Sequence, residues 1–193
     1  MSRPADLRIC LVGETGSGKS TTAAVLRETL AAAGRPSRLL PLAALLQDLQ
    51  NLLYRELDVP KPADRQDQQL MVDLATNIRR IRPTALVDRF ERALGTLPPG
   101  TVAINADLRD HAVDAPRLRE LGFFFVRVRC HRAVRAARLR LRDDLSVVDD
   151  EALFQLDRIG CDVEFDNSRD GLEHVRRFCA ELLRQTAGVA PCC

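Results

Sequence analysis

The sequence lacks a long apolar run, a surplus of charge of either sign and a CxxC pair of cysteines. Without an apolar stretch long enough for a secretion signal or a bilayer span, we expect a soluble, cytoplasmic protein with no membrane partner. Lys and Arg total 29 against 27 Asp and Glu, and so small an imbalance argues against nucleic acid as a partner. The six cysteines show no zinc-type spacing with histidine, so we interpret them as reduced thiols.

Lysine is nearly absent as well. Only Lys19 and Lys61 are lysines among the 29 basic residues, and Lys19 lies inside a glycine-rich motif. Because the formal net charge is only +2, any anion-binding site has to be local. A chain of 193 residues can bury a sizeable core, and we expect one domain over residues 1–193.

Short apolar runs alternate with longer amphipathic stretches along the chain. The apolar runs predict strands at 7–12, 38–42, 101–105, 123–130 and 161–166. The amphipathic stretches predict helices at 19–33, 43–57, 68–80, 84–94, 115–121, 131–144, 149–157 and 171–185. Parallel strands need crossover helices of this length, so the pattern predicts a three-layer α/β fold with a parallel sheet flanked by helices.

The strongest motif is GETGSGKST at residues 13–21, which matches G-x-x-x-x-G-K-[ST] between a predicted strand and a predicted helix. Glycines let the backbone approach a phosphate closely, and the helix N-terminus favours an anion. We expect Lys19 to be a catalytic residue that contacts the β- and γ-phosphates, and we expect the Ser20 hydroxyl to bind Mg²⁺. The residues expected to bind the ATP phosphates are Gly13, Thr15, Gly16, Ser17, Gly18, Lys19, Ser20 and Thr21.

A second constellation, NADLRD at 105–110, follows the third predicted strand. Ligands of open α/β sheets bind at the carboxyl ends of strands, which places Asp107 and Arg109 near the motif above. Asp107 is a candidate catalytic residue that holds a magnesium-bound water or accepts the proton of the acceptor, and Arg109 is a candidate phosphate ligand. The alternative is a loop held by salt bridges.

A basic helix is predicted over HRAVRAARLRLRDD. Spacing by three or four residues places Arg135, Arg138 and Arg142 on one face. Arginines on such a face can neutralise a transferring phosphoryl group, and we take Arg138 and Arg142 as catalytic candidates. A solvated helix face is the alternative for each of them.

A third cluster combines Arg79, Arg80 and Arg82 with the preceding amides of Gln68, Gln69 and Asn77. Arginine can hold a phosphate, and an amide can form hydrogen bonds with the edge of a base. We therefore expect an acceptor pocket that uses Gln69 and Arg80.

These residues resemble the nucleoside monophosphate kinase group of P-loop proteins, most closely the bacteriophage-type deoxynucleoside monophosphate kinases. That resemblance rests on LPLAALLQDL, QLMVDLATNIRR, ADLRD and LRELGFFFVRV, over about residues 38–128. The final third resembles dephospho-coenzyme A kinases in RLRLRDDLS and CDVEFDNSRDGLEHVRRF. The resemblance implies a P-loop NTPase fold with a helical acceptor-binding insert at about 43–94 and a short arginine-rich lid at about 131–150. It also places Arg138 and Arg142 in the lid, Asn167 and Arg169 near the adenine, and Arg80 and Arg109 at the acceptor phosphate.

The sequence thus predicts an ATP-dependent kinase that uses Mg²⁺ and phosphorylates a nucleoside monophosphate. Dephospho-coenzyme A or another small metabolite is an alternative acceptor, and a non-catalytic ATP-binding regulatory protein is an alternative of another class. A GTPase is not expected, because the chain has no NKxD motif that would read guanine. The expected partners are small-molecule nucleotides, and a homodimer stays open.

Overall fold

The computed structural model describes residues 7–60, 67–141 and 156–187. Its centre is a sheet of five parallel strands in the order β2-β3-β1-β4-β5. The strands are β1 (Arg8–Val12), β2 (Ser37–Leu39), β3 (Val102–Asn105), β4 (Phe124–Arg129) and β5 (Val163–Asp166). The predicted α/β fold with a parallel sheet is confirmed.

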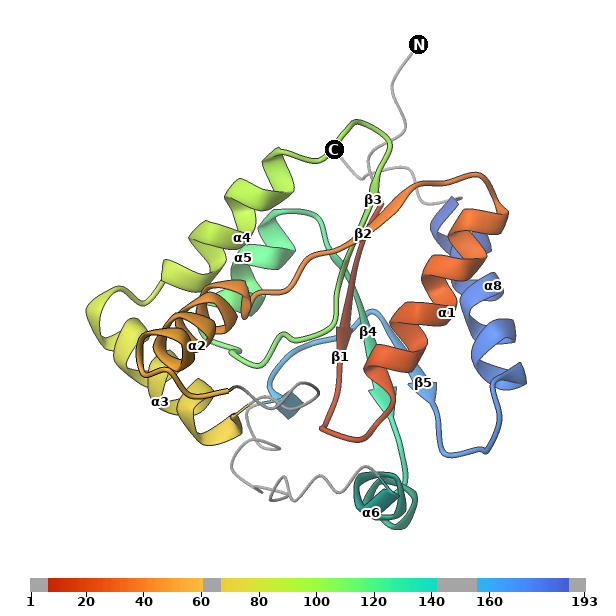
Figure 1. Cartoon of the computed structure of the whole chain (residues 1–193). Helices are drawn as coiled ribbons and strands as arrows, with labels where there is room; N and C mark the ends of the chain where they lie inside the picture. Colours follow the sequence, from red (N-terminus) through yellow and green to blue (C-terminus); the bar gives the residue numbers. More distant parts are fainter. Residues whose placement is uncertain (1–6, 61–66, 142–155, 188–193) are drawn as a thin grey trace.

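Helices cover both faces of this sheet (Figure 1). Successive side chains of a strand point to opposite faces, so Ile9 and Leu11 of β1 pack in the core beneath α1 (Lys19–Ala32) and α8 (Glu173–Ala187). Cys10 and Val12 pack in the second core, beneath α4 (Ala85–Gly95) and α5 (Asp114–Glu120). All four of these β1 residues are fully buried, at 0% exposure, as expected of a central strand covered on both sides.

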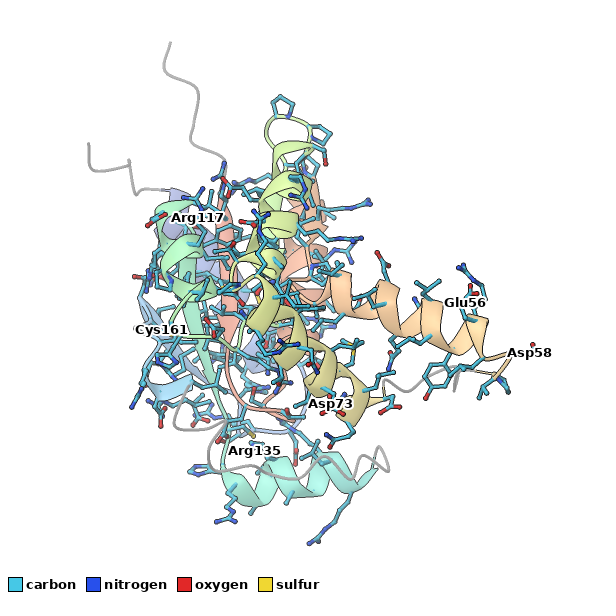
Figure 2. All side chains as sticks on the ribbon, turned by 90° about the vertical axis from the view of Figure 1, so that its left-hand side faces the viewer. Glu56, Asp58, Asp73, Arg117, Arg135 and Cys161 are labelled. Carbon is cyan, nitrogen blue, oxygen red and sulfur yellow. The ribbon has the colours of Figure 1, made fainter. Side chains whose placement is uncertain are left out.

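The predicted acceptor-binding insert corresponds to α2 (Ala44–Glu56), α3 (Gln68–Ile81) and α4. These helices share a small core of their own, formed by Leu46, Met71 and Leu86. Figure 2 shows α2 projecting away from the sheet, with Glu56 and Asp58 at its far end. Helix α4 contributes to both cores, because its Val87 and Phe90 pack in the second core of the sheet, so it joins this small core to the rest of the domain.

Helix α6 (Arg132–Leu141) follows β4 and lies at the carboxyl ends of the strands (Figure 1). Only the first part of the predicted lid is therefore described. Arg142, the rest of the lid and most of the helix predicted at 149–157 lie outside the described residues. None of the helices in the described ranges is long and apolar enough to cross a membrane.

Strand β2 ends three residues earlier than predicted, at Leu39 instead of Leu42. Leu40 N still donates to Ile104 O at 2.8 Å. Beyond it, the N–H of Leu42 donates to the Asp107 carboxylate at 3.0 Å and so has a partner outside any ladder. The connection to α2 is therefore fixed by a side chain, which a hydrophobic pattern cannot reveal.

Candidate active site

The glycine-rich motif forms the loop between β1 and α1, at the carboxyl edge of the sheet. Gly16 and Gly18 adopt φ values of +81° and +96°, in the left-handed region that favours glycine. Helix α1 begins at Lys19, directly after Gly18. The N–H groups in the first turn of a helix have no intrahelical acceptor, so the loop presents donors suited to an anion.

The Lys19 ammonium folds back over its own loop. Nζ donates to Gly13 O at 2.6 Å and to Glu14 O at 2.8 Å. Burial, the largest cause, and the charge of Arg109 together lower the Lys19 pKa to about 7 against the opposing effect of Asp107. A buried ammonium held by neutral carbonyls gains from a negatively charged partner, and a phosphate would be one.

The hydroxyl residues of the loop differ in accessibility. Ser20 is exposed at the start of α1, where its hydroxyl is free to meet a metal ion or a phosphate. Ser17, in contrast, is fully buried at 0% exposure, and its Oγ has no hydrogen-bond partner in the described parts of the chain. The Ser17 side chain is therefore turned into the protein, and its backbone groups are engaged as well: its N–H donates to Glu14 O at 3.2 Å, and its C=O accepts from Asn167 at 2.8 Å.

Helix α6 packs directly onto the loop. Arg135 is buried, at 5% exposure; it forms an ion pair with Glu14 and donates from Nε to Thr15 O at 3.2 Å. A Cβ added to Gly16 would lie 3.0 Å from Leu139 Cγ. Figure 2 shows Arg135 on the side of α6 that faces the body of the protein. Spacing predicted that Arg135 and Arg138 share a face, but nothing in the sequence indicated Glu14 as a partner.

Arg138 reaches the loop that follows β5. Its guanidinium donates from Nη1 to Asn167 O at 3.0 Å and from Nη2 to Arg169 O at 3.1 Å. Beside it lies a cavity of about 300 Å³ lined by Gly18, Thr21, Arg138, Asn167, Leu172 and Val175. The structure thus brings Arg138 and Asn167 together next to the glycine-rich loop, whereas Arg169 contributes its carbonyl and keeps its side chain exposed.

Asp107 is engaged by backbone donors. Its two oxygens accept from Leu42 N and Ala43 N, both at 3.0 Å, and Oδ1 also accepts from Asn105 Nδ2 at 2.6 Å. The carboxylate therefore holds the connection between β2 and α2 through backbone N–H groups and an amide, not through the salt bridges of the structural alternative. Its catalytic role stays a prediction.

Arg109 extends from the same segment to the glycine-rich loop. Its Nη2 lies 3.4 Å from Thr15 Oγ1, and the residue is otherwise exposed. Its positive charge is one of the causes that lower the Lys19 pKa. Two like charges held close together at an open site favour an anion between them.

The cluster on α3 is divided by the fold. Arg79 forms an ion pair with Asp114 at 2.6 Å, and Arg82 forms one with Asp88 at 2.6 Å. Arg80 is exposed and has no partner among the described residues, so its guanidinium is available to a ligand. Gln69 is also exposed and donates to Asp73 at 3.0 Å.

A larger cavity, of about 510 Å³, lies between the glycine-rich loop and the ends of β4 and β5. Its charged lining includes Arg127, Arg132 and Arg135. Arg127 is buried at 8% exposure, and its guanidinium donates to Leu156 O at 3.2 Å. This arginine holds the chain that returns to β5.

One polar residue near this edge, His111, was not singled out from the sequence. His111, two residues after Arg109, lies 3.3 Å by its Nε2 from Arg158 Nη1. Its Nδ1 is buried without a hydrogen-bond partner in the ranges that the structure describes. No local pattern could have indicated it, because its neighbour is 47 residues away.

No family profile matches the sequence, and no curated protein matches it either. Among solved structures, the chain is similar to TT1252 from Thermus thermophilus, with 22% identity, a TM-score of 0.55 and coverage of 95% of this chain and 98% of that one. It is similar to a tunicamycin resistance protein from Deinococcus radiodurans, at 19% identity and TM-score 0.54 over 96% and 97% of the two chains. It is also similar to shikimate kinase from Acinetobacter baumannii in complex with shikimate, at 15% identity and TM-score 0.52 over 95% and 94%. Because all three identities are low, these likenesses establish the fold alone.

Proposed function

We propose that the chain is an ATP-dependent kinase that transfers the γ-phosphoryl group of ATP to a nucleoside monophosphate and gives the diphosphate. The observation that carries this proposal is the approach of cations to one glycine-rich loop from different parts of the chain. Lys19 lies on the loop itself, and Arg109 contacts it from the segment after β3. Phosphoryl transfer depends mainly on positioning and on charge neutralisation, which these residues supply.

The loop and the smaller cavity together form the proposed nucleotide site. The polyphosphate would lie on the backbone N–H groups of residues 15, 16 and 18–20 with Lys19, and the adenine would enter the 300 Å³ cavity beside Arg138, Leu172 and Val175. The described residues hold no cluster of three or more His, Cys, Asp or Glu side chains that could bind a metal. This fits Mg²⁺ that arrives with ATP and takes the Ser20 hydroxyl as its protein ligand, since Mg²⁺ keeps several waters. When bound, the ion neutralises phosphate oxygens.

The acceptor would lie between the loop and the insert. Arg109 and Arg80 would hold its phosphate, and Gln69 would contact its base. Arg109 is within reach of the loop, so an acceptor phosphate held there would face the γ-phosphate. Asp107 fixes the β2–α2 connection and with it the start of the insert. The choice of a nucleoside monophosphate is supported by the sequence resemblance to that kinase group.

A second candidate is a kinase for another small metabolite, such as dephospho-coenzyme A. The likeness in fold to shikimate kinase supports this second candidate. A nucleotide-binding protein without catalysis is distinguished by Arg109→Ala. Because Arg138 lines the proposed adenine cavity, its loss would lower affinity in both cases, so Arg109→Ala is the matched test. In a kinase it lowers turnover far more than nucleotide affinity, and equal losses in both would favour the binding protein.

The proposal is tested by ADP release with Mg·ATP against ribo- and deoxyribonucleoside monophosphates and dephospho-coenzyme A, with Lys19→Ala as the blank. We expect one monophosphate to stimulate ADP release, and the stimulation to be lost in the blank. Stimulation by dephospho-coenzyme A alone would establish the second candidate. ATP binding without stimulation by any member of the panel would exclude a nucleotide acceptor.

A further inference from the structure

Asn167 is a buried polar side chain beside the glycine-rich loop. It lies directly after β5 and is 4% exposed. Its Nδ2 donates to Ser17 O at 2.8 Å, and its Oδ1 lies 2.8 Å from His174 Nε2 on α8. Both ends of the amide thus have a partner within the protein.

The orientation of this amide follows from its partners. A carbonyl oxygen only accepts hydrogen bonds, so the group of Asn167 that faces Ser17 O must be the NH₂. The Asn167 oxygen then faces His174, and His174 Nε2 must carry a hydrogen.

The contact also determines where the neighbouring N–H points. Ser17 C=O and Gly18 N–H belong to one peptide, and no peptide in the described residues is cis. In a trans peptide the two groups point in opposite directions. Asn167 therefore holds Ser17 C=O on its own side and directs Gly18 N–H to the other side.

The absence of a side chain at Gly18 lets Asn167 come close to the loop. A Cβ on Gly18 would lie 2.1 Å from Asn167 Nδ2, a distance at which the amide would have to move. Asn167 is itself fixed, because its N donates to Arg129 O at 2.8 Å and its O accepts from Arg138. The amide is a rigid support against which the loop rests.

We propose that Asn167, oriented by His174, is a positioning residue that holds the glycine-rich loop in its phosphate-binding conformation. Its amide tethers Ser17 C=O and so aims Gly18 N–H at the bound phosphate. His174 acts only through Asn167. The phosphate ligand rests on the proposed function, whereas the tether itself does not.

The experiment uses the full chain with Asn167→Ala, His174→Phe, His174→Gln and the double variant Asn167→Ala/His174→Phe. Gln185→Ala, which removes an exposed amide near the end of α8, is the matched control. Hydrogen exchange of residues 13–22 is measured in the free protein, and Mg·ADP affinity is measured by calorimetry. A tether predicts faster exchange in this segment, with β4 unchanged, and about tenfold weaker binding for Asn167→Ala.

The histidine variants test the order of action. We expect His174→Phe to weaken binding by about threefold, His174→Gln to restore much of the loss through its amide N–H, and the double variant to be no worse than Asn167→Ala. Unchanged loop exchange in Asn167→Ala overturns the inference whether or not nucleotide binds. Faster loop exchange in a protein whose wild type binds no nucleotide would leave the tether established and refute the proposed function.

Discussion

At the scale of single residues, Lys19 is the group with the most consequential electrostatics. Its ammonium contacts two carbonyl oxygens of its own loop at 2.6 and 2.8 Å, and burial, together with the charge of Arg109, lowers its pKa to about 7. A substantial share of Lys19 is therefore neutral at neutral pH. A polyphosphate placed beside it raises the pKa again, because an opposite charge favours the protonated form.

Binding of ATP at neutral pH should therefore take up a proton. At pH 7 we expect Lys19 to take up about half a proton for each nucleotide bound. Below pH 6 we expect little uptake, because the lysine is already charged there. Affinity should fall as the pH rises above 7, by up to about tenfold per unit until the raised pKa of the complex is passed. Calorimetry in buffers of different ionisation enthalpy measures the uptake. Because phosphates also titrate, Lys19→Met is the control, and an equal uptake in this variant would contradict the assignment to Lys19.

At the scale of elements, the packing of α6 against the glycine-rich loop includes an ion pair between Arg135 and Glu14. Glu14 lies within the loop, and its carboxylate would repel a bound polyphosphate if it were not neutralised by Arg135. Arg135 is buried, and burial lowers its pKa, so the guanidinium depends on its acidic partner. Removing one member of the pair would therefore leave the charge of the other without a partner, whereas removing both would not.

Removal of Arg135 alone should impair nucleotide binding. We expect Arg135→Met to weaken Mg·ATP binding by about tenfold, because an unpaired Glu14 then faces the phosphates. Glu14→Gln combined with Arg135→Met removes both charges and should recover most of the affinity. Fluorescence titration with a labelled ATP analogue, at constant salt, measures both. A double variant as weak as Arg135→Met would show that packing of α6, and not charge, sets the affinity.

The elements themselves could largely be predicted from the sequence. Helical periodicity and the stop at Gly34 predicted α1 to within one residue of its observed end at Ala32, because these signals are local. The partners of the site residues could not be predicted. Asn167 and Ser17 are 150 residues apart, and Leu42 and Asp107 are 65 apart, so no spacing rule connects them. Asp107 was recognised as a residue at a strand end, but its backbone partners depend on the fold.

At the scale of the whole molecule, the insert has to be held in place against the sheet domain. Arg79 of α3 forms an ion pair with Asp114 at the start of α5, and Asp114 is only 1% exposed. Arg89 of α4 likewise pairs with Asp48 of α2. The first contact crosses from α3 to α5, which covers the sheet, so it links the predicted insert to the rest of the protein.

Loss of Arg79 should destabilise the protein in a pH-dependent way. Burial raises the Asp114 pKa even with Arg79 present, so Arg79→Met should raise it further and leave an unpaired buried carboxylate near pH 7.5. We expect a loss of about 3 kcal/mol in the free energy of unfolding there, at the low end for a broken buried pair because 26% of the Arg79 side chain is exposed. A carboxyl whose folded pKa lies above its unfolded pKa loses stability as the pH rises, so the loss should shrink towards pH 5. Urea denaturation at both pH values measures it. Arg79→Met with Asp114→Asn should lose less and show no such pH dependence, whereas a loss for Arg79→Met that is equal at both pH values would exclude Asp114 as its cause.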